Sequence, residues 1–157
     1  MKIVVDINLL IDFSRSKKVK DFLWLNLLEY CKKEGHQLIL PSIVVFEFFS
    51  GEEMNNQTNQ EIAENLFNDV LILGFNEEIA KKAAAYFRKY KKSINVLDYF
   101  LAATTVVVEG ELATLNSKHF KLFGDLKLFD FKKLVKKDFI AVLNSALVKS
   151  PYKRSPF

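Results

Sequence analysis

Residues 2–11, KIVVDINLLI, decide how the chain begins to fold. The β-branched run at 2–5 predicts a short buried strand. Asp6 ends that strand, and the polar side chains of Asp6 and Asn8 can cap the helix expected to follow. A strand that passes directly into a helix is the first unit of an α/β fold, and here it leaves an acid at the carboxyl end of the strand.

The rest of the chain continues this alternation. Further strands are expected at 37–40, 70–73, 111–114 and 127–129, helices at 18–34, 42–49, 60–68, 76–90 and about 95–110, and a loop at 51–59. This order predicts an α/β fold with one parallel sheet covered by helices on both faces. We assign residues 1–130 to a single domain and residues 131–157 to a C-terminal basic amphipathic helix, ending near Lys149, and a tail.

Composition excludes several classes of protein and site. The 157 residues are 50% apolar and 27% charged, which suits one folded domain. The single cysteine, Cys31, the lack of a visible signal peptide and the lack of an apolar stretch of about 20 residues lead us to expect a cytoplasmic protein that does not enter a membrane. Two histidines and one cysteine are too few for a four-ligand zinc site. None of the five glycines forms a phosphate-binding Gly-rich loop, so any metal must be held mainly by oxygen.

Positive charge is concentrated in two places. Residues 1–115 carry 13 basic and 16 acidic side chains, whereas residues 116–157 carry 10 basic and three acidic ones. A further run of six cations without an acid lies within residues 81–92. This asymmetry is typical of a surface that binds a polyanion such as nucleic acid, although each run alone is explained equally by the solvated face of a helix.

Four polar side chains are expected near the carboxyl ends of the strands, where open α/β sheets bind ligands. Asp6 closes the first strand, and Glu47 lies in the helix after the second. Asp98 lies in the first turn of the helix before the fourth strand, and Asn116 follows that strand. Each has an ordinary structural explanation as a helix cap, a surface residue, a helix-dipole partner or a turn residue.

The carboxylates are harder to explain together than singly. Two like charges about 4 Å apart repel by roughly 4 kcal/mol near a protein surface. A fold that gathers Asp6, Glu47 and Asp98 therefore needs a cation or raised pKa values. Carboxylate oxygens with open water positions suit Mg²⁺ or Mn²⁺. This inference depends on the sheet topology to bring the three groups together.

Four motifs then resemble those of the PIN-domain nucleases. The segment VVDINLLI at 4–11 is similar to the strand, D-x-N and apolar helix that open the family's fold. Pro41-Ser42, followed by Glu47 and Gly51, resembles the second motif. DYFLAA at 98–103 is similar to the third, D-x-x-[IL]-A-A, and LATLN at 112–116 with Phe120 is similar to the fourth, T-x-N-x-x-x-F after a strand. By size and pattern the chain most resembles the ribonuclease toxins of VapBC-type toxin–antitoxin modules, over residues 2 to about 130.

This resemblance implies a fold, an activity and partners. It implies a five-stranded parallel sheet and a Mg²⁺- or Mn²⁺-dependent endoribonuclease that cleaves RNA phosphodiester bonds with a metal-activated water. It implies Asp6, Glu47 and Asp98 as metal-binding and catalytic residues, with Asn116 as the fourth catalytic position. Asn8 and Thr114 would support them, with capping as an equal alternative. The implied partners are single-stranded or loop RNA, a cognate antitoxin and a second copy of the chain.

The sequence departs from the family pattern at two positions. Asn116 stands where many members have Asp, which removes a charge and makes a second metal ion less favoured than the first. Leu115 stands where Arg is common, so one phosphate contact is missing. Asp125 is expected to lie in a turn rather than to replace the missing acid, and His119 is expected to be a surface residue.

Two other functions remain open at this point. One is a housekeeping RNA-processing nuclease with the same chemistry, and the other is a non-catalytic PIN-like module that binds RNA or a protein. A two-component receiver domain shares the alternation of strands and helices but needs a phosphorylatable Asp after the third strand. Gly74 and Phe75 follow residues 70–73 instead, which excludes that class.

Overall fold

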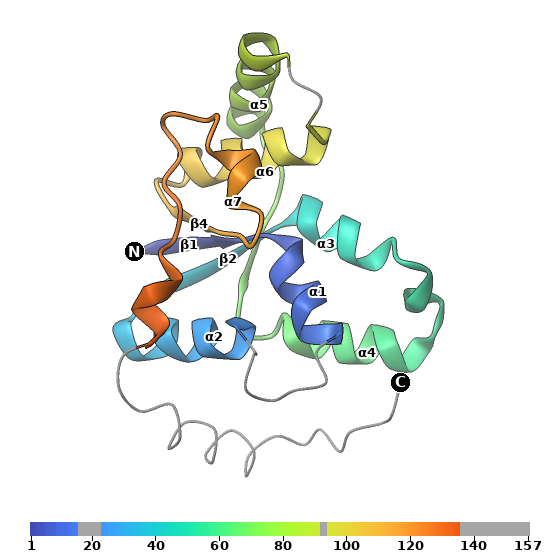
Figure 1. The fold of residues 1–157 in the computed structure, drawn as a ribbon. Coiled ribbons are helices and arrows are strands. Elements are labelled where there is room, and N and C mark those ends of the chain that lie inside the picture. The colour runs from blue at the N-terminus through green and yellow to red at the C-terminus, as the bar shows by residue number, and fades with distance from the viewer. Residues whose placement is uncertain (16–22, 92–93, 136–157) are drawn as a thin grey trace.

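The computed structural model describes residues 1–15, 23–91 and 94–135. At its centre is a parallel sheet with the strand order β3–β2–β1–β4 (Figure 1). The strands are β1 (Lys2–Val5), β2 (Gln37–Pro41), β3 (Leu71–Leu73) and β4 (Glu111–Ala113). Because β1 pairs with β2 on one side and with β4 on the other, its carboxyl end opens at the middle of the sheet edge. The predicted α/β class and parallel pairing are confirmed.

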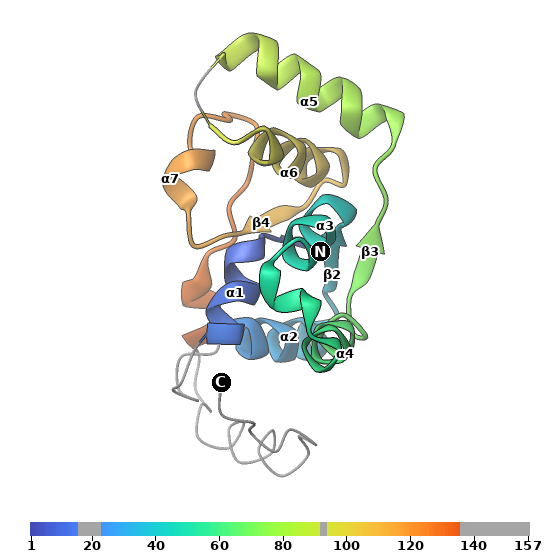
Figure 2. The same cartoon turned by 90° about the vertical axis from the view of Figure 1, so that its right-hand side faces the viewer.

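Helices cover both faces of this sheet (Figure 1). One face carries α1 (Ile7–Arg15), α2 (Leu23–Glu34) and α4 (Gln57–Leu66), and the other carries α5 (Glu77–Tyr90), α6 (Val96–Val107) and α7 (Ser117–Phe120). Helix α3 (Ser42–Phe49) follows β2 directly. Figure 2 shows β3 at one edge of the sheet, away from β4. Helices α1, α3 and α6 therefore all begin near the carboxyl ends of the strands.

The prediction of a fifth strand at 127–129 is wrong: within the described residues the sheet has four strands. Leu128 forms only an isolated parallel bridge to Leu112. Leu112 makes both hydrogen bonds that flank this bridge. Its N–H donates to Lys127 O, and its carbonyl oxygen accepts from Phe129 N, each over 2.8 Å. A strand requires consecutive paired residues, and this segment makes a single pair before Asp130 leads into the 3₁₀ helix η3 (Phe131–Val135).

Side-chain caps determine where several helices begin, and the spacing of apolar residues alone predicts these boundaries less well. The expected loop at 51–59 contains the 3₁₀ helix η2 (Glu52–Asn55) and the first turn of α4. The Asn56 side chain accepts hydrogen bonds from the backbone of Thr58 and Asn59, so α4 begins at Gln57 rather than near residue 60. The Asn95 side chain accepts a hydrogen bond from Leu97 N, so α6 begins directly after it, close to the expected start near residue 95. Gly35, with φ of +66°, ends α2 as its sequence position predicts.

Two expected helical segments extend beyond the described residues. The first residues of the helix expected at 18–34 lie outside them, and α2 is described from Leu23. The C-terminal helix expected from residue 131 to about residue 149 is described only as far as η3, which is a 3₁₀ helix and not an α-helix. The remainder of that prediction, with the tail to residue 157, lies outside the described part of the chain.

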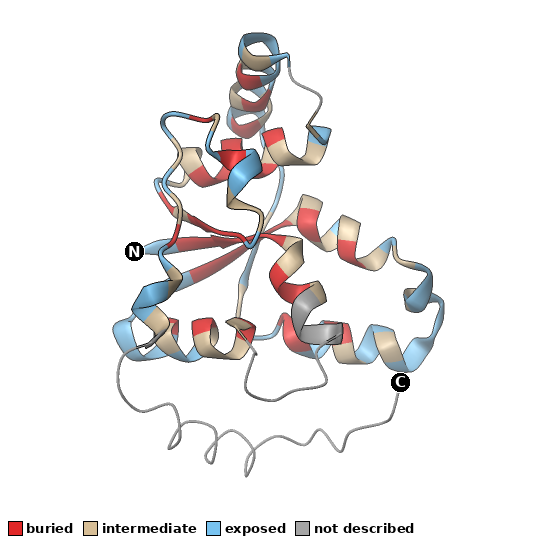
Figure 3. Ribbon diagram, in the orientation of Figure 1, coloured by how far each residue is buried: buried red, intermediate tan, exposed pale blue. Residues whose placement is uncertain are grey.

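The core lies between the sheet and its helices (Figure 3). The apolar residues of β1, Ile3 to Val5, are fully buried, as their β-branched run predicts. Trp24 on α2 is also fully buried. On the opposite face, the rings of Phe123 and Tyr99 lie 5.8 Å apart. No helix in the described residues has the length and apolar character needed to span a membrane.

Candidate functional site

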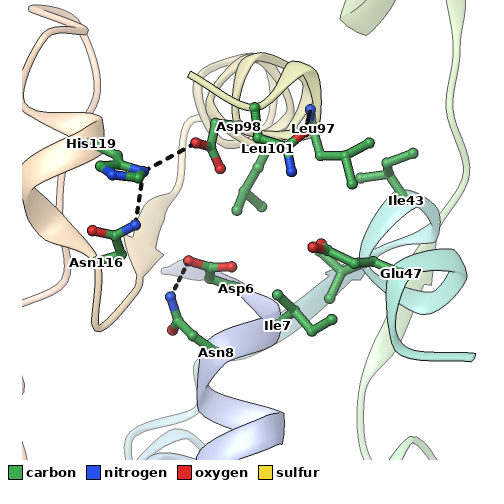
Figure 4. Close-up of a pocket in the computed structure, with 12 residues that line it drawn as sticks. Asp6, Ile7, Asn8, Ile43, Glu47, Leu97, Asp98, Leu101, Asn116 and His119 are labelled. Atoms are coloured by element: carbon green, nitrogen blue, oxygen red, sulfur yellow. Dashed lines mark hydrogen bonds and ion pairs between the residues drawn. The ribbon is translucent and has the colours of Figure 1, made fainter. Parts of the chain in front are cut away.

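The four candidate residues come from four different segments and line one pocket of about 260 Å³ (Figure 4). Asp6 follows β1, Glu47 lies on α3, Asp98 lies in the first turn of α6, and Asn116 lies between β4 and α7. Asn8, one of the two supporting candidates, also lines the pocket. The sheet order places β1 next to both β2 and β4, so elements far apart in sequence open onto this one edge.

Asp6 is the most tightly held of these side chains. Its exposed fraction is 6%. Thr114 Oγ1 and Asn8 Nδ2 each donate a hydrogen bond to its Oδ2 atom over 2.6 Å. Thr114 is buried at 5% exposure and does not line the pocket, so it supports Asp6 from beneath. These two donors fix one face of the carboxylate and leave the other oxygen toward the pocket.

A second pair of hydrogen bonds ties the same residues to the loop after β4. Asn8 Oδ1 accepts from Leu115 N over 3.0 Å, and Thr114 Oγ1 accepts from Asn116 N over 3.0 Å. Asn8 and Thr114 also bond to each other, from Nδ2 to Oγ1 over 3.1 Å. Both supporting candidates therefore link the end of β1 to the end of β4, and Thr114 also caps the turn that leads into α7.

Burial raises the pKa of all three pocket carboxylates, and charge repulsion adds to it at Asp6 and Glu47. Burial raises the pKa of Asp6, and the nearby charge of Asp98 raises it further, against the hydrogen bond from Thr114. Burial also raises the pKa of Glu47, with added repulsion from Asp6 and Asp98. The pKa of Asp98 is raised by burial, although its contact with His119 acts in the opposite direction. Three acids that disfavour one another's charge in one pocket form a site of negative potential.

The donor set of this pocket fits a hard divalent cation. Its charged groups are carboxylates, and its neutral oxygens are amides, which are the ligands Mg²⁺ and Mn²⁺ prefer. Within the described part of the chain, however, no three His, Cys, Asp or Glu side chains are gathered closely enough to hold one ion directly. The three-carboxylate ligand set implied by the family resemblance therefore stays a prediction, and Mg²⁺ itself is commonly held by one or two carboxylates together with water.

His119 is a pocket residue that sequence reasoning placed on the open surface. It lines the same pocket as Asp98 and Asn116. Its Nδ1 atom lies 2.8 Å from Asn116 Nδ2 and 3.4 Å from Asp98 Oδ2 (Figure 4). Its spacing of three residues from Asn116, across a turn into α7, is the signal that could have placed it here.

Asp125 lies outside the pocket, as expected. Lys82 Nζ donates to its Oδ2 atom over 2.7 Å, and Tyr86 Oη donates to its Oδ1 atom over 2.5 Å. These contacts join α5 to the segment after α7. They also leave Asp125 engaged in structure, so it does not replace the acid missing at Asn116.

Comparison with known proteins agrees with this geometry. The family model described as "PIN domain" matches residues 3–125. The chain belongs to the PIN-domain family. This PIN domain is 28% identical over 127 residues to Ribonuclease VapC19 of Mycobacterium tuberculosis, covering 79% of this chain and 96% of the relative. It is 29% identical over 136 residues to Ribonuclease VapC1 of Methanocaldococcus jannaschii, covering 82% of this chain and 88% of that protein.

Solved structures show the same fold. The PIN domain aligns with a chain of VapBC2 from Rickettsia felis, bound to a DNA fragment from their promoter, with a TM-score of 0.70 and 19% identity over 82% of this chain and 98% of that chain. It aligns with a chain of FitAcB from Neisseria gonorrhoeae with a TM-score of 0.63 and 22% identity over 83% and 98% of the two chains. The resemblance inferred from the four sequence motifs is confirmed.

Proposed function

We propose that this PIN domain is a Mg²⁺- or Mn²⁺-dependent endoribonuclease and the toxin of a toxin–antitoxin pair. One observation carries the proposal: Asp6, Glu47 and Asp98, from three separate elements, face one pocket in which each has a raised pKa. Relatives that span most of the chain are named ribonucleases. One of the aligned structures is of proteins named as VapBC2, which supports an antitoxin partner.

Each pocket residue would have a separate role in phosphodiester hydrolysis. Asp6 and Asp98 would hold the cation, with Glu47 reaching it through water. When bound, that cation supplies positive charge against the developing charge on phosphate and makes an attacking water more acidic. Asp6, held by Thr114 and Asn8, presents a fixed oxygen that orients this water. Asn116 contributes an amide without adding to the repulsion among the carboxylates.

RNA is the proposed substrate, taken in single-stranded or loop form because its exposed bases are then free to be bound. The exposed cations Lys118 and Lys121 flank the pocket residue His119 on and after α7. Such side chains contact phosphate and position a strand without reading its sequence. We place the protein in the cytoplasm, where its substrate RNA is found.

A protein partner is supported by a second, apolar hollow beside the pocket. It is lined by Ser42, Ile43, Phe46, Phe75 and Phe100, and Ile43 also lines the carboxylate pocket. Phe46 is 63% exposed and Phe75 is 55% exposed. Exposed aromatic side chains around a hollow without charged residues favour contact with protein rather than RNA. A second copy of this chain and the antitoxin are the partners proposed.

The test is cleavage of a labelled bulk RNA pool. Cleavage is expected to require added Mg²⁺ or Mn²⁺ and to stop with EDTA. Asp98→Asn is expected to lower the rate at least about a hundredfold, because loss even of a residue that supports a metal ligand costs about 10- to 100-fold. Cleavage by a folded Asp98→Asn variant at the wild-type rate would refute the proposal.

Two other functions are separated by simple measurements. A non-catalytic PIN module is expected to bind no Mn²⁺ in the pocket by calorimetry. A housekeeping nuclease shares the metal-dependent cleavage but is expected to leave growth unaffected on expression, whereas a toxin arrests growth until its antitoxin is supplied.

A further inference from the structure

His119 lies between two residues of the candidate site that come from different segments. Asp98 belongs to α6, and Asn116 precedes α7. A single atom, His119 Nδ1, faces both of them, at 3.4 Å from the Asp98 carboxylate and 2.8 Å from the Asn116 amide (Figure 4). The imidazole therefore fixes the separation of two groups that no described hydrogen bond joins directly.

Few other contacts hold these two side chains. Among the hydrogen bonds and ion pairs of the described residues, His119 is the side-chain partner of both Asp98 and the Asn116 amide. The side chain of Asp98 is 19% exposed, so its freedom is limited mainly by this contact and by packing. Without the ring, each side chain would regain rotamer freedom, which would have to be removed again when a ligand binds.

The short helix that carries His119 is itself firmly anchored. Phe120 and Phe123, on either side of the next turn, are 1% and 2% exposed. The ring of Phe123 lies 4.7 Å from that of Tyr86 and 5.8 Å from that of Tyr99. The Asp125 contacts to α5 hold the far end of the same segment. A half-exposed His on so fixed a turn is well placed to orient its neighbours.

The amide at position 116 and the ring match as hydrogen-bonding partners. Asn116 Nδ2 carries hydrogens, and His119 Nδ1 accepts one when it carries no proton. A protonated Nδ1 donates to Asp98 Oδ2 instead, so this nitrogen makes one of the two hydrogen bonds at a time. In either case the ring lies between the two side chains and limits their movement.

We propose that His119 is a positioning residue of the nuclease site, holding Asp98 and Asn116 at a fixed separation through its Nδ1 atom. This inference rests on the proposed function. It assigns His119 neither contact with the scissile phosphate nor a proton transfer. Its effect on the reaction passes through the two residues it orients.

The experiment compares three folded variants of the full chain. His119→Leu removes the hydrogen-bonding atom while keeping an apolar side chain of similar reach. His119→Asn places an amide group where Nδ1 lies and cannot become charged. His36→Leu, at the chain's other histidine, which lies outside the pocket with its ring against Tyr30, is the matched control. The measurements are Mn²⁺ affinity by calorimetry without RNA, and kcat and KM on a labelled bulk RNA pool at a Mn²⁺ concentration near the wild-type Kd.

His119→Leu is expected to weaken Mn²⁺ binding and lower kcat by about tenfold each, with KM changed less than about twofold. His119→Asn is expected to recover most of both losses, and His36→Leu is expected to keep the wild-type kcat and Mn²⁺ affinity. Wild-type Mn²⁺ affinity in His119→Leu would overturn the proposal. A higher KM with unchanged kcat would also overturn it, because the ring would then be binding RNA. Equal damage in the Asn and Leu variants would also overturn the proposal, because a hydrogen-bonding group at the position of Nδ1 would then make no difference.

A double-mutant comparison guards against a purely structural effect. If His119 acts through Asn116, then His119→Leu is expected to cost much less in Mn²⁺ affinity when Asn116→Ala is already present. Full additivity would contradict the inference. Failure here is distinct from failure of the proposed function, because Asp98→Asn tests that function in the same assay and does not depend on His119.

Discussion

Asp125 and the pocket carboxylates carry the same chemical group in opposite surroundings. Asp125 accepts hydrogen bonds from Lys82 and Tyr86, and these lower its pKa although partial burial acts in the other direction. In the pocket, burial raises the pKa of Asp6, Glu47 and Asp98, and repulsion among them raises it further at Asp6 and Glu47. Asp125 has a lysine partner, whereas none of the three pocket acids has a lysine or arginine partner among the described residues.

This difference distinguishes acids whose contacts stabilise the fold from acids that are proposed to bind a cation. The bonds around Asp125 connect α5 to the segment beyond α7 and are complete without any further group. Glu47 shows the contrast most clearly, because within the described residues its carboxylate has no hydrogen-bond donor and faces two other acids. Unpaired negative charge in a pocket is relieved when a cation binds.

The largest expected effect is on catalysis, from the matched pair Asp6→Asn and Asp125→Asn. Asp6→Asn is expected to lower cleavage of bulk RNA at least about a hundredfold, because loss of a metal-binding oxygen should cost no less than loss of an outer support. Asp125→Asn is expected to change cleavage by less than about threefold. Rates are measured at equal concentrations of folded protein. Equal losses in the two variants would erase the distinction between the two kinds of acid.

The next effect is on stability, from Asp125→Asn alone. Loss of the charged acceptor is expected to lower the free energy of unfolding by about 1 kcal/mol, the upper range for a partly exposed pair. Because the pKa of Asp125 is lowered in the folded state, its contribution is present above its ordinary pKa of 3.8 and is lost as pH falls through the folded value. Urea unfolding at pH 7 and near pH 3 measures this. A gap between the two proteins that widens in acid would contradict the assignment.

A smaller effect of opposite sign is expected for Glu47→Gln. In EDTA at pH 7, removal of this charge relieves repulsion with Asp6 and Asp98 and should stabilise the folded protein by about 0.5 kcal/mol. Added Mn²⁺ is expected to raise the Tm of wild type more than that of the variant. Thermal unfolding with and without Mn²⁺ provides both numbers. Destabilisation of the metal-free variant would mean that Glu47 has a structural partner.

The smallest effect is expected for Asn116→Asp. A fourth acid next to Asp98 is expected to lower the free energy of unfolding in EDTA by a few tenths of a kcal/mol, and to tighten Mn²⁺ binding. Calorimetry and thermal unfolding test the two parts together. Weaker Mn²⁺ binding would indicate that the bond from the Asn116 amide to His119 matters more than the added charge.

Several features could be predicted from local sequence because local interactions decide them. The buried β-branched residues of β1, the end of α2 at Gly35 and the Asn95 cap of α6 all depend on neighbouring residues. The prediction of a fifth strand was wrong because strand pairing depends on tertiary structure and not only on neighbouring residues. Residues 127–129 have a strand-like composition, but the number of pairs they form depends on where the chain turns beside β4.

The site divides in the same way. Motif spacing indicated Asp6, Glu47, Asp98 and Asn116, and all four line the pocket. His119 was missed because its role depends on the distance of its ring from Asp98, which is 21 positions away in the chain and comes close only when α6 and α7 pack on the sheet. The spacing of the carboxylates likewise could not be known in advance, and it proved wider than direct ligation of one ion by three groups requires.

By itself, the sequence determined the alternation of strands and helices, the family and the identity of the acids, because these follow from periodicity and from short motifs that act over a few residues. Tertiary structure alone decided which acids are satisfied and which are left facing one another. It did so because a carboxylate's charge state and partners depend on burial and on through-space distances, and these are fixed only when the strand order brings β1, α3, α6 and the loop after β4 to one edge.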